Sequence, residues 1–202
     1  MFRWVALVVF VAVFTISGYY RRQARRTSEI IDRRREGTTL LLLRVIFALP
    51  MFVSVLVYLV RPPLMAWAQL PLPPWLRWIG VCLGALTIPS AWWLFSNLGR
   101  NVSETVLTKA DHELVTTGPY QWVRHPLYTT AGAMFVAIGL MAANWFILLF
   151  AGLIVFLVRL LVVPREEQAL ISKFGDDYRD YTMRTGAMLP RLMRSGRPSS
   201  SA

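Results

Sequence analysis

The sequence is poor in the residues on which several enzyme and scaffold classes depend. Its 202 residues include a single cysteine, Cys82, which excludes a fold held together by disulfides. Two histidines, without further cysteines or clustered acids, do not make a zinc site, so no metal is expected. No glycine-rich loop lies between a strand and a helix, which excludes a Rossmann dinucleotide fold. Charged residues are only 16% of the chain, against roughly 25% in a soluble domain.

What the chain has instead is apolar bulk together with a basic excess. Hydrophobic residues make up 55% of the sequence, which excludes disorder. Yet 22 Lys and Arg against 11 Asp and Glu give a net charge of +11. A nucleic-acid binder would gather this charge on one folded face, and the distribution along the chain does not support that arrangement. The combination is typical of a membrane protein with arginines in the loops on one side.

Five apolar segments approach the roughly 20 residues that a helix needs to cross a bilayer core of about 30 Å. They cover residues 4–20, 40–60, 75–96, 126–143 and 145–163. We therefore expect an all-α integral membrane protein with five transmembrane helices and a cytoplasmic C-terminal helix. Asn144 separates the last two segments, which predicts a tight helical hairpin.

The basic residues predict which way the helices face. Seventeen of the 22 Lys and Arg lie in residues 21–39, 97–125 and 164–202, on one side of the five-span arrangement. The positive-inside rule makes this side cytoplasmic, so we expect the N-terminus outside and the C-terminus inside.

The expected organisation has three parts. Residues 1–60 hold two transmembrane helices joined by the basic cytoplasmic loop 21–39. Residues 75–192 form the core that carries the chemistry. The Ser/Pro/Arg-rich residues 193–202 are expected to be a disordered tail.

Polar residues gather in two predicted cytoplasmic segments, residues 97–128 and 164–192, which flank the hairpin and therefore meet at its open end. Pro126 favours the first position of a helix, and the free N–H groups of that helix start, with Arg124, would form an anion site. The alternative for Arg124 is a snorkelling arginine at a capped membrane helix. Glu166 is a candidate acceptor for the hydroxyls or amine of a ligand, and the alternative is a solvated helix start. Gly175 is expected to interrupt the C-terminal helix.

The same two segments carry a pair of motif blocks. The first, from His112 to Tyr128, reads H-x-L-V-x-x-G-P-Y-x-x-x-R-H-P-x-Y. The second, from Glu166 to Tyr181, reads E-E-x-x-L-x-x-x-F-G-x-x-Y-x-x-Y and is followed by Pro190. Together they resemble the isoprenylcysteine carboxyl methyltransferase family, within a wider group of membrane methyltransferases that includes phospholipid N-methyltransferases.

This resemblance implies S-adenosylmethionine (SAM) as methyl donor, bound at the cytoplasmic end of the hairpin. The cofactor-binding residues that it implies are His112, Glu113, Leu114, Val115, Tyr120, His125, Pro126, Leu127, Tyr128 and Glu166. Arg124 and Glu166 are the predicted catalytic residues. The lipid bilayer and a lipophilic acceptor, most simply an isoprenylcysteine carboxylate, are the expected partners, and no nucleic acid is expected.

The sequence departs from the family at one position that bears on the substrate. An arginine linked to substrate binding stands a few residues before the paired glutamates in the eukaryotic enzymes, and Val162 takes that place here. Arg159 and Arg165 are nearby and are the predicted substrate-binding residues. Another lipid, a small thiol or an amine therefore stays open as acceptor. An NADPH-dependent sterol-type reductase, which commonly carries Asn where Leu127 stands, and a non-enzymatic scaffold are the alternative functions.

Overall fold

The structure, a computed structural model, describes residues 1–27, 44–98 and 114–191. Its α-helices are α1 (Phe2–Thr27), α3 (Leu49–Val60), α4 (Pro74–Leu98), α5 (Pro126–Ala142), α6 (Trp145–Leu157), α7 (Val163–Phe174) and α8 (Asp176–Arg184). Shorter helical turns are η2 (Arg44–Ala48), η3 (Pro62–Ala68), η5 (Gly118–Gln121) and η6 (Val158–Val162). The predicted tail 193–202 and residues 28–39 of the predicted basic loop lie outside the described residues.

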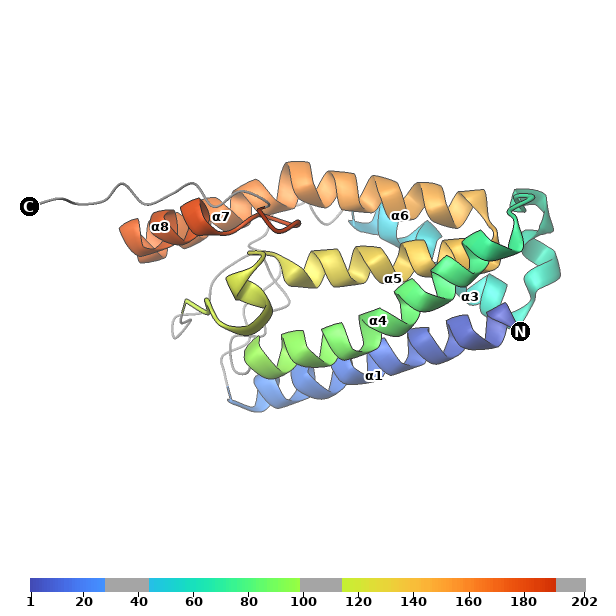
Figure 1. Cartoon of the computed structure of the whole chain (residues 1–202), viewed down its shortest axis with the longest axis horizontal. Helices are drawn as coiled ribbons and strands as arrows, with labels where there is room; N and C mark the ends of the chain where they lie inside the picture. Colours follow the sequence, from blue (N-terminus) through green and yellow to red (C-terminus); the bar gives the residue numbers. More distant parts are fainter. Residues whose placement is uncertain (28–43, 99–113, 192–202) are drawn as a thin grey trace, which may run out of the picture.

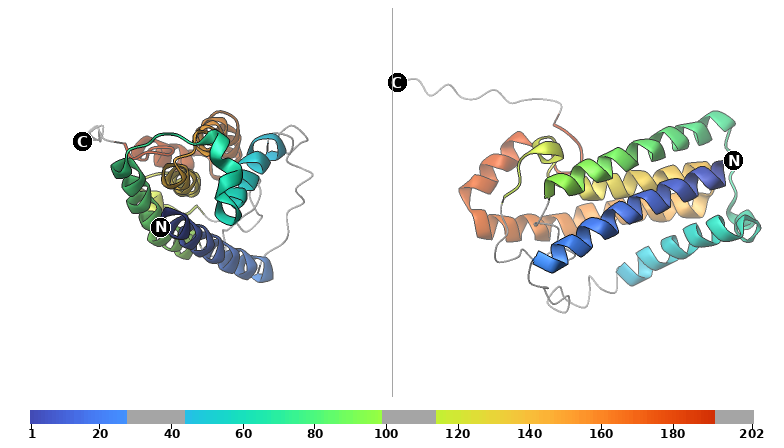
Figure 2. Two further views of the ribbon diagram at one scale, coloured as in Figure 1. Left: turned by 90° about the vertical axis from the view of Figure 1, so that its right-hand side faces the viewer. Right: turned by 90° about the horizontal axis from the view of Figure 1, so that it is seen from below.

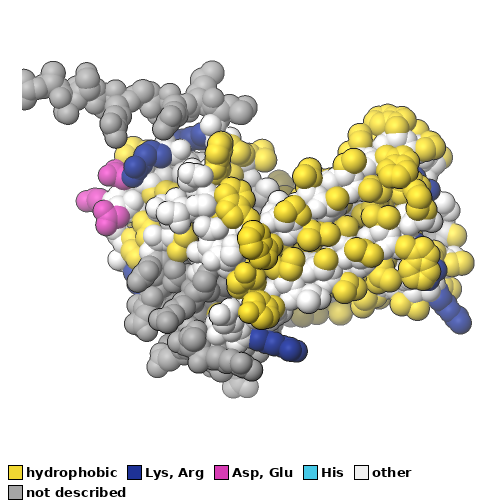
Figure 3. All heavy atoms as spheres, turned by 60° about the horizontal axis from the view of Figure 1, so that its bottom comes forward, with side chains coloured by type: hydrophobic (Ala, Val, Ile, Leu, Met, Phe, Trp, Pro, Cys, Tyr) yellow, Lys and Arg dark blue, Asp and Glu magenta, His cyan; other side chains and the backbone are white. Residues whose placement is uncertain are grey.

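The described helices confirm an all-helical membrane fold. Three of them are long and apolar enough to cross a bilayer, over Phe2–Ala24, Pro74–Leu98 and Trp145–Phe174. Two further apolar helices, Val45–Val60 and Pro126–Ala142, are shorter. Hydrophobic side chains cover much of the bundle surface, whereas the acidic side chains on the visible face lie at its left-hand end (Figure 3). The five-span count and the sidedness stay predictions.

The long helices pack side by side along the molecule. Figure 1 shows α1, α4, α5 and α6 running lengthwise, with α7 and α8 beyond the start of α5, and the views of Figure 2 show the same arrangement end-on and from below. Helix α4 packs against both α1 and α5. The approach to α5 is close at Gly80, where a Cβ would lie 2.9 Å from the carbonyl oxygen of Ala137. Glycine is therefore what lets these two backbones meet at this point.

The predicted hairpin between α5 and α6 is confirmed, and its turn is fixed by Asn144. Ala143 adopts a left-handed conformation with φ of 50°, which ends α5. The buried Asn144 side chain accepts a hydrogen bond from the Ile147 N–H at 3.0 Å, so it caps α6, and its Nδ2 donates to the Met65 carbonyl at 3.3 Å. Because this turn fixes the register of the two helices, the first residues of α7 come to lie beside the first residues of α5.

The apolar segment predicted over residues 145–163 is part of a longer helix. The helix runs without a break from Trp145 to Phe174. The reason is the π-helical turn η6, in which the Val163 N–H bonds to the Val158 carbonyl, five residues earlier. This change of hydrogen-bond register accommodates a proline, which lacks an N–H. The break expected at Gly175 is confirmed, since this residue, with φ of 56°, separates α7 from α8.

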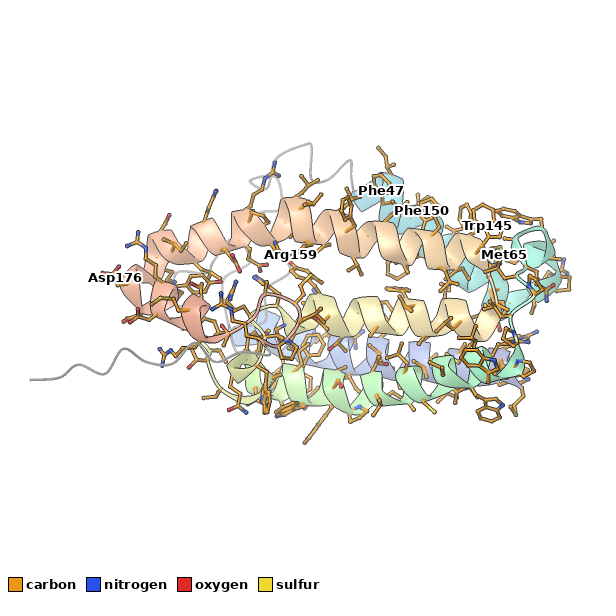
Figure 4. The ribbon with its side chains drawn as sticks, turned by 45° about the horizontal axis from the view of Figure 1, so that its top comes forward. Phe47, Met65, Trp145, Phe150, Arg159 and Asp176 are labelled. Atoms are coloured by element: carbon orange, nitrogen blue, oxygen red, sulfur yellow. The ribbon has the colours of Figure 1, made fainter. Side chains whose placement is uncertain are left out.

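All eight tryptophans of the sequence are exposed, and they lie toward the two ends of the bundle. Five lie toward the hairpin turn: Trp4, Trp67, Trp75, Trp78 and Trp145. Three lie toward the start of α5: Trp92, Trp93 and Trp122. Figure 4 shows Trp145 and Met65 at the end opposite Asp176. Exposed tryptophans in two such bands are typical of helices that meet both faces of a bilayer.

Candidate functional site

Four charged or titratable side chains meet where α5 and α7 begin. We call Arg124, His125, Glu166 and Glu167 the charged cluster. Arg124 Nε lies 2.8 Å from Glu167 Oε1, and His125 Nε2 lies 3.3 Å from the same oxygen. On the other side of the imidazole ring, His125 Nδ1 lies 3.3 Å from Glu166 Oε2. The histidine is therefore held between two carboxylates that are neighbours in the sequence.

This position decides the charge of His125. The residue is only 6% exposed, and burial by itself lowers the pKa of an imidazole. The contact with Glu167 and the charge attraction from both Glu166 and Glu167 act in the opposite direction and prevail, so the pKa of His125 is raised above its ordinary value of 6.5. The positive charge of an imidazolium is attracted to the carboxylate on each side of the ring.

Arg124 joins the cluster to the C-terminal helix. Beside its contact with Glu167, its Nη1 donates to the carbonyl oxygens of Thr182, at 3.1 Å, and of Thr185. These carbonyls belong to the end of α8, where a helix leaves its acceptors without partners inside the helix and favours a cation. Arg124 thus caps α8 while it neutralises Glu167.

Tyrosines surround the charged cluster. Tyr128 stacks on the His125 ring with centroids 5.9 Å apart, and the Tyr181 hydroxyl donates to the Tyr120 carbonyl at 2.6 Å. Burial raises the pKa of Tyr181 to about 12, and it also raises the pKa of Tyr120 and of Tyr178. These phenols are therefore neutral at physiological pH and act as packing and hydrogen-bonding groups.

Among the residues that the structure describes, two side-chain polar atoms at this end of the molecule are buried without a hydrogen-bond partner: Glu166 Oε2 and the Tyr178 hydroxyl. Glu166 Oε2 is near enough to His125 for charge attraction, but the two do not meet hydrogen-bond geometry. A buried polar atom left in this way costs about 1–3 kcal/mol. Such atoms are natural contact points for a ligand that supplies the missing donor or acceptor.

The structure gathers most of the residues that the sequence singled out. Around the start of α5 lie Tyr120, Arg124, His125, Pro126, Leu127, Tyr128 and, from α7, Glu166. Tyr120 and Leu127 pack together against the apolar residues Ala24, Leu94 and Phe95.

The other predicted residues lie elsewhere or beyond the described chain. Leu114 and Val115 are half-buried in the segment that leads into η5, and His112 and Glu113 lie outside the described residues. Arg159 and Arg165 are both exposed, on η6 and α7.

Glu167 is the residue that the sequence interpretation left without a role. The adjacent pair Glu166-Glu167 was visible, but neighbouring residues on a helix point in directions about 100° apart. Only the placement of His125 between them gives both a common partner. Within the described residues no group of three or more His, Cys, Asp or Glu side chains is arranged to hold a metal ion.

Comparison with known proteins places this geometry in a family. The chain is 39% identical over 80 residues to the nickel-cobalt-cadmium resistance protein NccN of Alcaligenes xylosoxydans xylosoxydans, covering 40% of this chain and 37% of that protein. It is 32% identical over 116 residues to the protein-S-isoprenylcysteine O-methyltransferase of Schizosaccharomyces pombe, covering 55% and 47% of the two chains. The enzyme of the same name from Tribolium castaneum is 31% identical over 123 residues, covering 57% and 42%. The chain thus spans less than half the length of these curated relatives.

A solved structure and a family match agree with these relatives. The fold resembles that of a eukaryotic intramembrane Ras methyltransferase, isoprenylcysteine carboxyl methyltransferase, with a TM-score of 0.58 at 21% identity over 92% of this chain and 67% of that one. Residues 75–177, just over half of the chain, match the family of phospholipid methyltransferases and include the charged cluster. The resemblance expected from the two motif blocks is confirmed, and the chain belongs to the phospholipid methyltransferase family.

Proposed function

We propose that this protein is an integral-membrane methyltransferase that uses SAM to methylate a lipophilic acceptor. The observation that carries the proposal is the charged cluster, in which both motif blocks meet at the start of α5 and leave Glu166 Oε2 buried without a hydrogen-bond partner. The matched relatives named as isoprenylcysteine methyltransferases support the same reaction class.

The residues present fit the proposed cofactor. SAM carries hydroxyl and ammonium donors, and Glu166 Oε2 is a buried acceptor to which no donor of the described residues forms a hydrogen bond. Tyr120 and Leu127 lie beside the cluster and offer an apolar surface for an adenine ring. His125, Pro126 and Tyr128 would line the same site, and so would Leu114, Val115, His112 and Glu113 of the preceding segment.

The proposed methyl transfer requires little proton transfer by the protein. A carboxylate or thiolate acceptor would take the methyl group of bound SAM directly, with S-adenosylhomocysteine as the leaving group. The protein then has to hold the acceptor in line and exclude water from the site. The buried, neutral tyrosines and the apolar residues around the cluster suit this task, and no general base is required. Arg124 was predicted as catalytic; its contacts support a role in holding Glu167 and α8, and its part in the reaction stays a prediction.

We propose an isoprenylcysteine-like carboxylate as the simplest acceptor, with Arg159 and Arg165 as its counter-charges. Both side chains are exposed on the helix that carries Glu166, and Arg159 stands two turns before it. Figure 4 shows Arg159 near the level at which α5 begins, between the hairpin end and Asp176. A carboxylate held at the bilayer surface would meet these arginines, while its prenyl chain stays among the apolar helices.

The test is binding of labelled SAM to the full chain, purified in lipid nanodiscs, followed by methyl transfer to N-acetyl-S-farnesylcysteine, phospholipids or small thiols. Wild type should bind SAM and methylate the prenyl-cysteine analogue. Glu166→Gln should weaken SAM binding at least about tenfold, because hydrogen bonds to a charged acceptor contribute about 1.5–3 kcal/mol. Asp177→Asn makes the same change at an exposed position on α8 and is the matched control.

The result that would sink the proposal is absence of SAM binding by wild type, or equal binding by Glu166→Gln. Binding of SAM without transfer to the prenyl-cysteine analogue, but with transfer to a phospholipid or thiol, would keep the reaction class and reject the acceptor.

A further inference from the structure

The chain that follows α8 returns to the start of α5 and pairs with it. We call residues 185–188 the clasp. Val123 and Gly186 form a parallel β-bridge, in which the Gly186 N–H donates to the Trp122 carbonyl at 3.4 Å and the Arg124 N–H donates to the Gly186 carbonyl at 2.8 Å. One residue further, the His125 N–H donates to the Ala187 carbonyl at 2.9 Å. The backbones of both cluster residues that precede α5 are therefore held by the clasp.

Side chains fix the clasp at each of its ends. At its start, the buried Thr185 donates its hydroxyl to the Tyr181 carbonyl at 2.7 Å, and its own carbonyl accepts from the Arg124 guanidinium. At its end, the Met188 carbonyl accepts from the Thr129 hydroxyl at 2.7 Å, one turn into α5. The clasp thus spans the same residues that carry the charged cluster.

The clasp turns sharply, and Gly186 is what allows it. A Cβ built at this position would collide with the carbonyl oxygen of Leu189 and come within 3.2 Å of the Arg191 backbone nitrogen. A backbone carbonyl cannot move aside as a flexible side chain can, so even alanine at 186 must displace the clasp.

We propose that the clasp is a positioning element of the cofactor site, which sets Arg124 and His125 for cofactor binding; this rests on the proposed function. The two N–H groups lie outside the helix, and without the clasp only water would satisfy them. Once they are bonded to Gly186 and Ala187, the path of the chain into Pro126 is fixed, and with it the place of the imidazole between the two carboxylates. The clasp lies beyond residues 75–177, which match the family.

Four variants and two matched controls test the proposal. Gly186→Ala and Gly186→Val displace the clasp, Thr129→Val removes the hydroxyl that holds Met188, and Thr129→Ser restores it. Thr130→Val makes the same change at the next residue of α5, for which the described part of the chain shows no bond to the clasp. Gly152→Ala is the control for adding a methyl group, since nothing lies within 4 Å of a Cβ there.

The first readout is hydrogen exchange of the amides of Arg124 and His125, which donate to the clasp, in the full chain in nanodiscs, and it needs no cofactor. Exchange should be slow in wild type, in both controls and in Thr129→Ser. It should be faster in Thr129→Val and fastest in Gly186→Val. Unchanged exchange in the folded Gly186 and Thr129→Val variants would overturn the proposal.

The second readout is the Kd for labelled SAM beside the KM for the acceptor. Thr129→Val should raise the Kd for SAM about fivefold, which is the effect of one lost hydrogen bond, and Thr129→Ser should bring it back. Gly186→Ala should raise it more, by about 25-fold, which is the effect of losing both backbone hydrogen bonds that hold Arg124 and His125. The KM for the acceptor should stay within about twofold, whereas general loosening of the fold would move both.

Two outcomes separate this proposal from the proposed function. If exchange rises while the Kd for SAM stays as in wild type, the clasp holds the two residues but does not position them for the cofactor, and the proposal is wrong. If wild type binds no SAM, the proposed function fails together with the cofactor role of the clasp, and the exchange rates still decide whether the clasp fixes Arg124 and His125.

Discussion

The two ends of the helix bundle each contain an arginine that caps a helix, but the two arginines contact different kinds of groups. At the hairpin end, Arg77 donates to the Met141 carbonyl near the end of α5, at 2.8 and 3.1 Å, and its guanidinium lies 4.1 Å from the centroid of the Phe2 ring. At the other end, Arg124 caps α8 and also faces the carboxylate of Glu167.

The difference between the surroundings of Arg77 and Arg124 shows how a helix-capping arginine can also belong to a functional site. Arg77 donates to a backbone carbonyl and lies over the ring of Phe2. Around Arg124, two carboxylates compete for one arginine and one histidine, and Glu166 Oε2 is left without a hydrogen bond. At the hairpin end, the buried polar atom without a hydrogen-bond partner among the described residues is Arg3 Nε. The Arg3 guanidinium lies 4.6 Å from the centroid of the Trp4 ring. The Glu166 carboxylate attracts a cationic ligand, whereas the Arg3 guanidinium repels one.

The largest expected effect comes from replacing the two arginines in turn. Arg124→Met leaves Glu167 without its main partner and should lower the free energy of unfolding by about 3 kcal/mol, the lower end for a buried pair because Glu167 is partly exposed. Arg77→Met removes a cap without leaving a carboxylate and should cost about 1.5 kcal/mol. Unfolding in mixed micelles measures both. SAM binding should be lost in Arg124→Met and retained in Arg77→Met. Equal effects of the two substitutions would contradict the proposed difference between the two ends of the bundle.

A smaller effect should separate two neighbouring tyrosines of α8. Tyr181→Phe removes the hydroxyl that donates to the Tyr120 carbonyl and should cost about 1 kcal/mol. Tyr178→Phe removes a buried hydroxyl that has no hydrogen-bond partner, so stability should stay the same or rise slightly. The same unfolding measurement compares the pair, and a larger loss for Tyr178→Phe would mean that its hydroxyl is bonded in the membrane-embedded protein.

The smallest effect is on pH dependence and concerns the site end. The pKa of His125 is raised in the folded protein, so its contacts with Glu166 and Glu167 stabilise the fold fully below about pH 6.5, the unfolded value. This stability is lost as pH rises from there through the folded pKa. The free energy of unfolding of wild type, measured from pH 6 to 9, should therefore fall relative to that of His125→Gln. A flat difference between the two curves would show that folding does not raise the pKa of His125.

Much of the fold could be predicted because its signals are local. Pro126 starts a helix by its fixed φ, Asn144 caps one with its side chain, and Gly175 breaks one by adopting a positive φ. The continuation of the last helix past Pro164 has no such local signal. A π-helical turn lies directly before this proline, and the spacing of apolar residues does not predict such a turn.

The sequence by itself determined where the apolar helices lie, that the two motif blocks meet at the open end of a hairpin, and which family they resemble. Only the tertiary structure decided what the residues of those blocks do to one another. The histidine stands between two carboxylates, the arginine caps a helix that begins more than fifty residues later, and the clasp holds both by backbone hydrogen bonds. The physical reason is that backbone groups are the same at every residue, so pairing between distant segments leaves no mark in the sequence of side chains.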